Sequence, residues 1–283
     1  MLGYVCKYTP MELFEAMDTE ITRLEPSVTD FNHADTLMHA NICSYTKAVL
    51  EDVMEHDYEG VILTTCCDSI RRLYDTLKSQ FPDKFFFLLD IPRKFNDFAV
   101  TLYERQLKQM LTEYEAFSGK TLDLKRFVSM MQNKAALKKQ ENTRMSASAA
   151  SEKGNGQKLN IGIMGARCNN EIRQLLVDRG ANLLFDLTCT GLAPDFSITE
   201  DQVLHSYAAA LLNQIPCMRM LKAANREHFL DGFTDRLDGI IYHTVKFCDS
   251  YSYEYADFRQ RLDLPILLVE TDSTRQCAGQ VRT

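Results

Sequence analysis

Short apolar runs alternate along this chain with segments of helical periodicity, and no other feature constrains its fold as much. The runs are rich in Val, Ile, Leu and Phe, as buried parallel strands are. A helical pattern with Ile70, Leu73 and Leu77 on one face separates the first two runs, and a similar pattern separates the third and fourth. We therefore predict an α/β fold of two doubly wound parallel-sheet domains. The predicted strands cover residues 60–65, 85–91, 160–165, 182–187, 239–247 and 265–271.

A different kind of sequence lies between the two halves. Residues 99–140 carry apolar side chains at rough helical spacing, and residues 141–158 are small, polar and without periodicity. We predict a first domain over 1–140 that ends in a helical extension, a flexible linker over 141–158, and a second domain over 159–283. Inside the second domain, two further helices are expected over 199–213 and 218–229, on either side of Pro216.

The composition excludes several classes of protein. With 283 residues the chain is long enough for two ordinary domains, and its net charge of −7 argues against nucleic-acid binding, which needs a basic face. No apolar run reaches the ~18 residues of a membrane span, and residues 1–7 lack the pattern of a signal peptide. We expect a cytoplasmic protein with no nucleic-acid or membrane partner, in which nine cysteines are poor candidates for structural disulfides.

Most of the cysteines lie beside predicted strand ends or sharp turns. Open α/β sheets bind ligands in the crevice at the carboxyl ends of their strands, and a helix that begins there favours thiolate over thiol. Thiolates that converge on such a crevice indicate a metal or iron–sulfur site between the two domains. The candidate ligands are Cys43, Cys66, Cys67, Cys189, Cys217 and Cys248.

The same cysteines have other interpretations. Each one alone is equally consistent with a small buried hydrophobic residue, and no Cys-x-x-Cys spacing of zinc ribbons or ferredoxins is present. A redox-active Cys66–Cys67 pair is a further alternative. Cys6, Cys168 and Cys277 have weaker contexts, and we expect them to be structural. Residues 162–166 form neither a dinucleotide fingerprint nor a P-loop, so we expect the chain to bind no nucleotide itself.

Longer motifs resemble the 2-hydroxyacyl-CoA dehydratase and benzoyl-CoA reductase family, and most of all its double-cubane cluster protein branch. They are GYVCKYTPMELFEA (3–16), NICSYTKA (41–48), CCDSIRRLYD (66–75), LDIPRK (89–94), NQIPCMR (213–219), HTVKFCD (243–249), ETD (270–272) and GQVRT (279–283). The resemblance implies two Rossmann-like domains joined by a helical connection, with a cofactor cleft between them. The family pattern continues past Thr283 into a terminal helix, which we expect the second domain to lack.

The resemblance also implies a cofactor. In ordinary dehydratase subunits three cysteines hold one 4Fe–4S cluster, and by motif these correspond to Cys43, Cys67 and Cys248. The additional motif cysteines resemble the double-cubane branch, in which two cubanes share a bridging sulfide. They are Cys66, Cys189 and Cys217. A double cubane is therefore favoured over a single 4Fe–4S cluster.

The implied function is that of a dehydratase-like lyase or an ATP-dependent reductase component. Such a chain receives low-potential electrons from a separate ATP-hydrolysing iron–sulfur activator and acts on an acyl-CoA or another small substrate that is hard to reduce. The family works as dimers, so a homodimer or a heterodimer is expected. The alternatives are a non-catalytic electron-relay or partner subunit and, in a different class, a zinc- or thiol-based regulatory protein.

Overall fold

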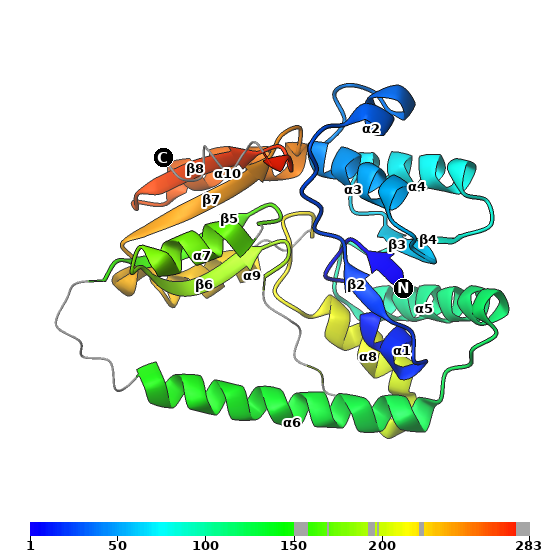
Figure 1. The fold of residues 1–283 in the computed structure, drawn as a ribbon. Helices are drawn as coiled ribbons and strands as arrows, with labels where there is room; N and C mark the ends of the chain where they lie inside the picture. The colour runs from blue at the N-terminus through cyan, green and yellow to red at the C-terminus, as the bar shows by residue number, and fades with distance from the viewer. Residues whose placement is uncertain (150–157, 169, 192–195, 197, 221–223, 276–283) are drawn as a thin grey trace.

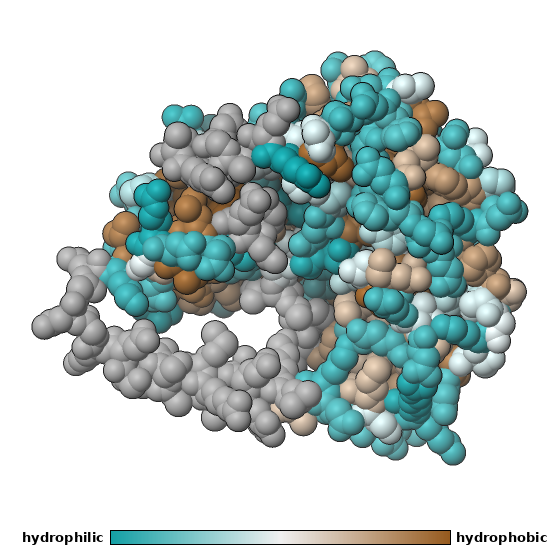
Figure 2. All heavy atoms as spheres, viewed as in Figure 1, coloured by the Kyte–Doolittle hydropathy of each residue, from teal (hydrophilic) through white to brown (hydrophobic). Residues whose placement is uncertain are grey.

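The computed structural model describes residues 1–149, 158–168, 170–191, 196, 198–220 and 224–275 (Figure 1). Part of the expected linker, Cys277 and the terminal GQVRT motif lie outside these residues. In the part of the chain that is described, no helix is long and apolar enough to cross a membrane. The face seen in Figure 2 is mostly hydrophilic over the N-terminal half, with apolar residues scattered across it.

The N-terminal half is built on a parallel sheet with the strand order β2-β1-β3-β4. β3 and β4 are the apolar runs predicted from the sequence, and nearly all of their residues are buried. Helices connect successive strands, as in any doubly wound sheet. The elements are β1 (Leu2–Tyr4), α1 (Met11–Ala16), β2 (Ile21–Arg23), α2 (Asn32–Leu37), α3 (Ser44–Glu55), β3 (Gly60–Thr64), α4 (Asp68–Gln80), β4 (Phe85–Leu89) and α5 (Asp97–Ser118).

The C-terminal half repeats this winding with the strand order β6-β5-β7-β8, again all parallel. Both sheets thus order their strands 2-1-3-4 by position along each half, although the sequence shows no internal repeat. The predicted α/β class with two doubly wound sheets is confirmed. The elements are β5 (Asn160–Gly165), α7 (Asn170–Asp178), β6 (Asn182–Thr188), α8 (Val203–Leu212), α9 (Ala224–Asp231), β7 (Gly239–Val245), α10 (Asp249–Arg261) and β8 (Ile266–Thr271).

The helical connection between the halves consists of α5 and α6 (Leu124–Ala149). The Asn96 side chain caps the start of α5 by accepting a hydrogen bond from the Ala99 amide, and Gly119 ends the helix with a φ of 71°. α6 continues through Ala149, although the sequence predicts a flexible linker from residue 141. The stretch from 141 to 149 contains no Gly or Pro to stop a helix, and Figure 1 shows α6 as one long helix along the lower side of the molecule.

The inserted segment of the second half packs into the core of the first. A 3₁₀ turn (Glu200–Gln202) leads into α8, as the sequence predicts for 199–213. Tyr207 and Leu211 of α8 are buried in the same core as Tyr103 and Leu107 of α5. Of the helix expected over 218–229, residues 218–220 are instead a turn, in which the Met220 amide donates to the Cys217 carbonyl, and α9 (Ala224–Asp231) covers the later part. This arrangement brings Cys217 against the N-terminal sheet.

Candidate functional site

A cavity lies where the carboxyl ends of the two sheets meet. It encloses about 790 Å³, counting its open mouth. Residues that follow β1 and β3 line it from the first half, and residues that follow β5, β6 and β7 line it from the second. The carboxyl ends of the strands in both sheets thus form the crevice, which is where open α/β sheets bind ligands.

Among the described residues, seven cysteines line this cavity. They are Cys6, Cys43, Cys66, Cys67, Cys189, Cys217 and Cys248. The structure therefore brings together all six cysteines singled out in the sequence. Cys168 packs instead against Ile163 and Ile172, away from the cavity lining.

The structure also places Cys6, whose sequence context is weaker, in the lining of the cavity. It follows β1, whose three residues are too few to show a strand pattern, so its position at a strand end was missed. β1 pairs in parallel with both β2 and β3 and is therefore central to its sheet. Central strands of such sheets point their carboxyl ends into the crevice, which places Cys6 in the cavity.

Cys43, Cys67 and Cys248 share a feature: each is the N-cap residue of a helix, namely α3, α4 and α10. Helix N-termini carry partial positive charge and free amide groups, which favour bound anions. The backbone ties these helix starts together. The Ser44 amide donates to the Lys246 carbonyl at 3.1 Å, and the Cys43 amide donates to the Ser69 hydroxyl at 3.4 Å. We call these cysteines the capping thiols.

The capping thiols include a hydrogen-bonded pair from opposite halves of the chain. A hydrogen bond from the Cys248 thiol lowers the pKa of Cys43 to about 7, against the opposing effect of burial. The same bond, together with burial, raises the pKa of Cys248. The pair therefore loses its first proton readily, and the remaining proton lies between the two sulfurs and is lost with difficulty.

Cys6, Cys66, Cys189 and Cys217 do not cap helices, and we call them the non-capping thiols. Burial raises the pKa of Cys6 and of Cys189 to about 12. The hydrogen bond to Cys67 and then burial raise the pKa of Cys66. Cys6, Cys66 and Cys189 therefore stay protonated at neutral pH unless a cation binds them.

Fixed positive charges face the thiols. Lys7 donates to the Ile215 carbonyl at 2.6 Å, and the Arg219 guanidinium donates to the Ile91 carbonyl at 2.9 Å. The Arg167 guanidinium lies 4.2 Å from the centroid of the Tyr45 ring. All three cationic residues line the cavity. A negatively charged occupant would therefore find compensating charge on several sides.

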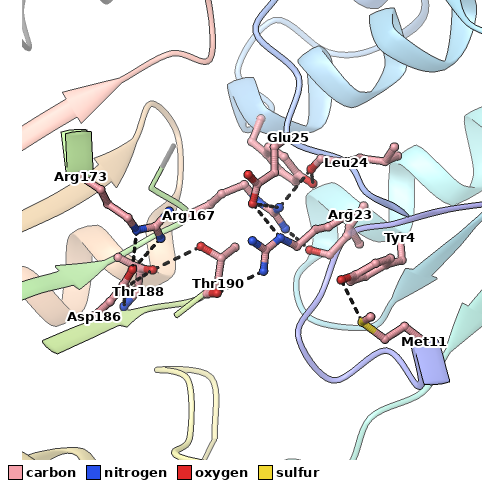
Figure 3. A network of polar contacts seen from close by, with 12 residues as sticks. Tyr4, Met11, Arg23, Leu24, Glu25, Arg167, Arg173, Asp186, Thr188 and Thr190 are labelled. Carbon is pink, nitrogen blue, oxygen red and sulfur yellow. Dashed lines mark hydrogen bonds and ion pairs between the residues drawn. The ribbon is translucent and has the colours of Figure 1, made fainter. Parts of the chain in front are cut away.

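Two arginines, Arg167 and Arg23, connect the two halves of the chain, as Figure 3 shows. Arg167, which follows β5, donates to the Leu24 carbonyl at 3.0 Å, donates to the Val5 carbonyl, and lies 3.8 Å from the Glu25 carboxylate. In the other direction, Arg23 of β2 donates to the Thr190 carbonyl at 3.1 Å. These bonds fix the walls of the cavity relative to each other.

Three buried polar atoms of cavity-lining residues lack a hydrogen-bond partner in the described part of the chain: the Thr46 Oγ1, the Arg219 Nε and the Tyr251 hydroxyl. Tyr251 is 7% exposed, and a buried donor without a partner is costly unless a ligand satisfies it. Within the described residues, no three His, Cys, Asp or Glu side chains converge on a single metal ion. The seven cysteines are spread over the lining of the cavity, and in a cluster each iron is bound by a different thiolate.

Fold and cavity define a two-domain α/β protein with a thiol- and cation-lined crevice. The chain belongs to the family described as 2-hydroxyglutaryl-CoA dehydratase, D-component, whose sequence profile matches residues 6–140 and 128–283. The matched segments span both halves and confirm the resemblance to the 2-hydroxyacyl-CoA dehydratases, while the double-cubane branch stays a prediction. A comparison with curated proteins found no match.

Proposed function

We propose that the cavity holds an iron–sulfur cluster and that the chain is the dehydratase component of a 2-hydroxyacyl-CoA dehydratase system. The observation that carries this proposal is the convergence of cysteines from both halves on one crevice, together with Lys7, Arg167 and Arg219. Thiolates are the usual protein ligands of 4Fe–4S clusters. The family match supports the substrate class, a 2-hydroxyacyl-CoA.

The cavity fits such a group electrostatically. Bringing several thiolates together in a buried space costs free energy, because each resists ionisation there. Cluster irons, the amides at the starts of α3, α4 and α10, and the cavity cations offset this cost. Binding of the cluster would then release the protons that Cys66 and Cys189 hold at neutral pH.

The capping thiols Cys43, Cys67 and Cys248 would hold one cubane, in agreement with the motif cysteines of ordinary dehydratase subunits. The second cubane of a double-cubane cluster would take its ligands from the non-capping thiols, where the sequence points to Cys66, Cys189 and Cys217. Adjacent residues Cys66 and Cys67 join the two groups. A single 4Fe–4S cluster on the capping thiols is the alternative.

When bound, the cluster would supply a low-potential single electron. Elimination from a 2-hydroxyacyl-CoA requires one because the β-hydrogen of the substrate is only weakly acidic. The residues of the chain then have simple roles. Val5, Ile70 and Val245 exclude water from the cavity. The Tyr251 hydroxyl donates a hydrogen bond to the bound group or to the substrate. Arg219 holds negative charge at the ends of β3 and β4.

The partners follow from this assignment. The electrons would come from a separate ATP-dependent iron–sulfur activator, which agrees with the place of a D-component within a larger enzyme system. A second subunit, identical or related, would complete a dimer. If turnover needs a further subunit besides the activator, the chain is an electron relay instead.

The test is anaerobic purification followed by measurement of iron, acid-labile sulfide and visible absorption per chain. We expect a brown protein with about eight iron atoms for two cubanes or about four for one. Cys168→Ala is the matched control, since Cys168 is buried outside the cavity lining, and it should keep the full iron content. Colourless, iron-free protein after anaerobic reconstitution would overturn the proposal. Dehydration of a 2-hydroxyacyl-CoA with activator and ATP then tests the reaction.

A further inference from the structure

We propose that the Thr46 hydroxyl donates a hydrogen bond to the sulfur of Cys43 and so raises the reduction potential of the bound cluster. This inference rests on the proposed function and deepens it, because it names a residue outside the thiols that sets how readily the cluster accepts an electron. Thr46 lies in the first turn of α3, which Cys43 caps, and it is a fully buried residue that lines the cavity.

The Thr46 hydroxyl differs from those of the other helical threonines that the structure describes. A threonine inside a helix can donate to the carbonyl of the residue four positions earlier. Four threonines of the described α-helices do so at 2.9 or 3.0 Å, namely Thr36, Thr76, Thr101 and Thr112. The Thr46 Oγ1 is buried and has no hydrogen-bond partner within the described residues. A buried donor of this kind costs free energy until the site supplies an acceptor.

The position of Thr46 in the helix explains this difference. It is the third residue of α3, so the residue four positions earlier is Ile42, which lies outside the helix. At a helix start, the side chains of the N-cap residue and of the third residue lie close together, as they do in a capping box. In α3 these two residues are Cys43 and Thr46. The hydroxyl therefore lies beside the capping sulfur instead of returning to the backbone.

The groups that act on Cys43 in the cluster-free chain support this placement. A hydrogen bond from the Cys248 thiol has the largest effect on the pKa of Cys43 and lowers it, and burial opposes this effect. The amides of Thr46 and Tyr45 lower the pKa further, and the Thr46 hydroxyl does so with the smallest effect. A small effect fits a donor that is close to the sulfur but not yet aligned with it.

The start of α3 is held in place from two sides. Toward the second half, the Ser44 amide and the Ser44 hydroxyl both donate to the Lys246 carbonyl, at 3.1 and 3.2 Å. Toward the first half, the Tyr45 hydroxyl donates to the Leu24 carbonyl at 2.8 Å. Ser44 and Tyr45 directly precede Thr46, so their bonds fix the turn that carries it. The Thr46 side chain therefore stays at the cavity whether or not the site is loaded.

Binding of iron removes the bond that Cys43 has in the cluster-free chain. Cys248 loses its proton when it binds iron, so it no longer donates to the Cys43 sulfur. The Thr46 hydroxyl then becomes a side-chain donor beside that sulfur. A hydrogen bond to a thiolate ligand draws off negative charge and favours the reduced cluster, and such bonds are among the factors that set the potentials of iron–sulfur clusters.

The experiment is a redox titration of the anaerobically purified full chain, followed by EPR spectroscopy of the reduced cluster. We expect Thr46→Val, which keeps the volume but removes the hydroxyl, to shift the potential to a more negative value, and Thr46→Ser to restore the wild-type value. Thr9→Val is the matched control, because the Thr9 Oγ1 is also buried without a partner in the described chain but Thr9 does not line the cavity. An unchanged potential in Thr46→Val, or an equal shift in Thr46→Ser or Thr9→Val, would overturn the proposal.

Two further measurements separate this role from a structural one. Chemical denaturation should find cluster-free Thr46→Val at least as stable as the wild type, since its hydroxyl has no partner in the fold; a clear loss of stability counts against the proposal. If Val blocks cluster binding, Thr46→Ala decides, and it must shift the potential in the same direction. A wild-type chain without iron refutes the proposed function itself, whereas a wild-type cluster whose potential ignores the hydroxyl refutes only the role of Thr46.

Discussion

The two groups of thiols in the cavity are prepared for negative charge in different ways. The capping thiols Cys43, Cys67 and Cys248 stand at helix N-termini, whose free amides favour a bound anion. The non-capping thiols have no such support, and burial raises the pKa of Cys6 and Cys189 to about 12. Side-chain cations lie near some of them: Arg167 and, with a smaller effect, Lys7 act to lower the pKa of Cys189, and Arg219 acts in the same direction on Cys66. In the proposed cluster site, the capping thiols would therefore have helix amides beside them, whereas the non-capping thiols would rely on side-chain cations.

The largest effect is expected from the capping side. Replacing Cys67 or Cys248 by Ala removes a proposed ligand at the start of a helix that also positions the other capping thiols. We therefore expect loss of the whole visible chromophore and of turnover. Iron analysis and absorption spectra check this. Retention of half the iron in Cys248→Ala would show that the capping thiols are not the primary group.

A smaller effect is expected when the charge beside the non-capping thiols is removed. Lys7→Met keeps most of the side-chain volume but takes away the ammonium next to Cys6, Cys189 and Cys217. Outer-shell changes of this kind typically weaken metal binding by about 10–100-fold. We therefore expect Lys7→Met to lose the iron of one cubane first when a chelator is titrated in. Lys84→Met is the control, because Lys84 pairs with Asp57 on the surface. If Lys7→Met and Lys84→Met kept their iron equally well against the chelator, the charge of Lys7 would not support the non-capping thiols.

The comparison also predicts how the cluster-free protein responds to pH. The pKa of Cys43 is lowered to about 7 from an ordinary 9.0, so between pH 7 and 9 the unfolded chain binds more protons and stability rises with pH. Above pH 9 the unfolded chain loses protons that Cys6 and Cys189 keep up to about pH 12, and stability falls.

We therefore expect a maximum of stability near pH 9, measured by chemical denaturation of reduced, cluster-free protein. Cys43→Ala should remove the rising limb, together with the thiolate absorbance at 240 nm that appears near pH 7. The double variant Cys6→Ala with Cys189→Ala should make the falling limb less steep, while Cys168, whose pKa burial also raises to about 12, keeps part of it. A rising limb that survives in Cys43→Ala would assign it to another group.

The long apolar strands and the helices between them could be predicted from the sequence, because a buried strand such as β4 carries its own signal in five consecutive apolar residues. β1 and β2 have three residues each, which is too short for a pattern. They form because β1 pairs with β2 on one side and with β3 on the other. Because β1 was not predicted, the position of Cys6 at the end of a strand was not predicted either.

The six cysteines at predicted strand ends and turns were found because the strand-end rule is local. The division of these cysteines into capping and non-capping thiols could not be found in this way, because it depends on contacts between distant segments. The bond from Lys7 to Ile215 joins residues 208 positions apart, and the contacts of Arg167 with Leu24 and Val5 span similar distances along the chain. Arg167 itself follows the end of β5, so the rule that selected the cysteines would also have selected this cation.

The smallest expected effect concerns Tyr251, which lies in α10 next to the capping thiol Cys248. Its hydroxyl has no hydrogen-bond partner in the described residues, so Tyr251→Phe removes a buried polar group that contributes nothing to the cluster-free fold. We expect unchanged or slightly higher stability, full iron content and lower turnover.

Tyr45→Phe is the matched control on the opposite wall, because the Tyr45 hydroxyl donates to the Leu24 carbonyl at 2.8 Å. Loss of that bond should cost about 1 kcal/mol of unfolding free energy. Chemical denaturation of the two cluster-free variants, side by side, measures the difference. If Tyr251→Phe is destabilised as much as Tyr45→Phe, its hydroxyl is already satisfied within the protein and is not held for a ligand. If stability is kept and turnover falls, the hydroxyl acts on the bound group, and the capping side of the cavity supplies a donor as well as thiolates.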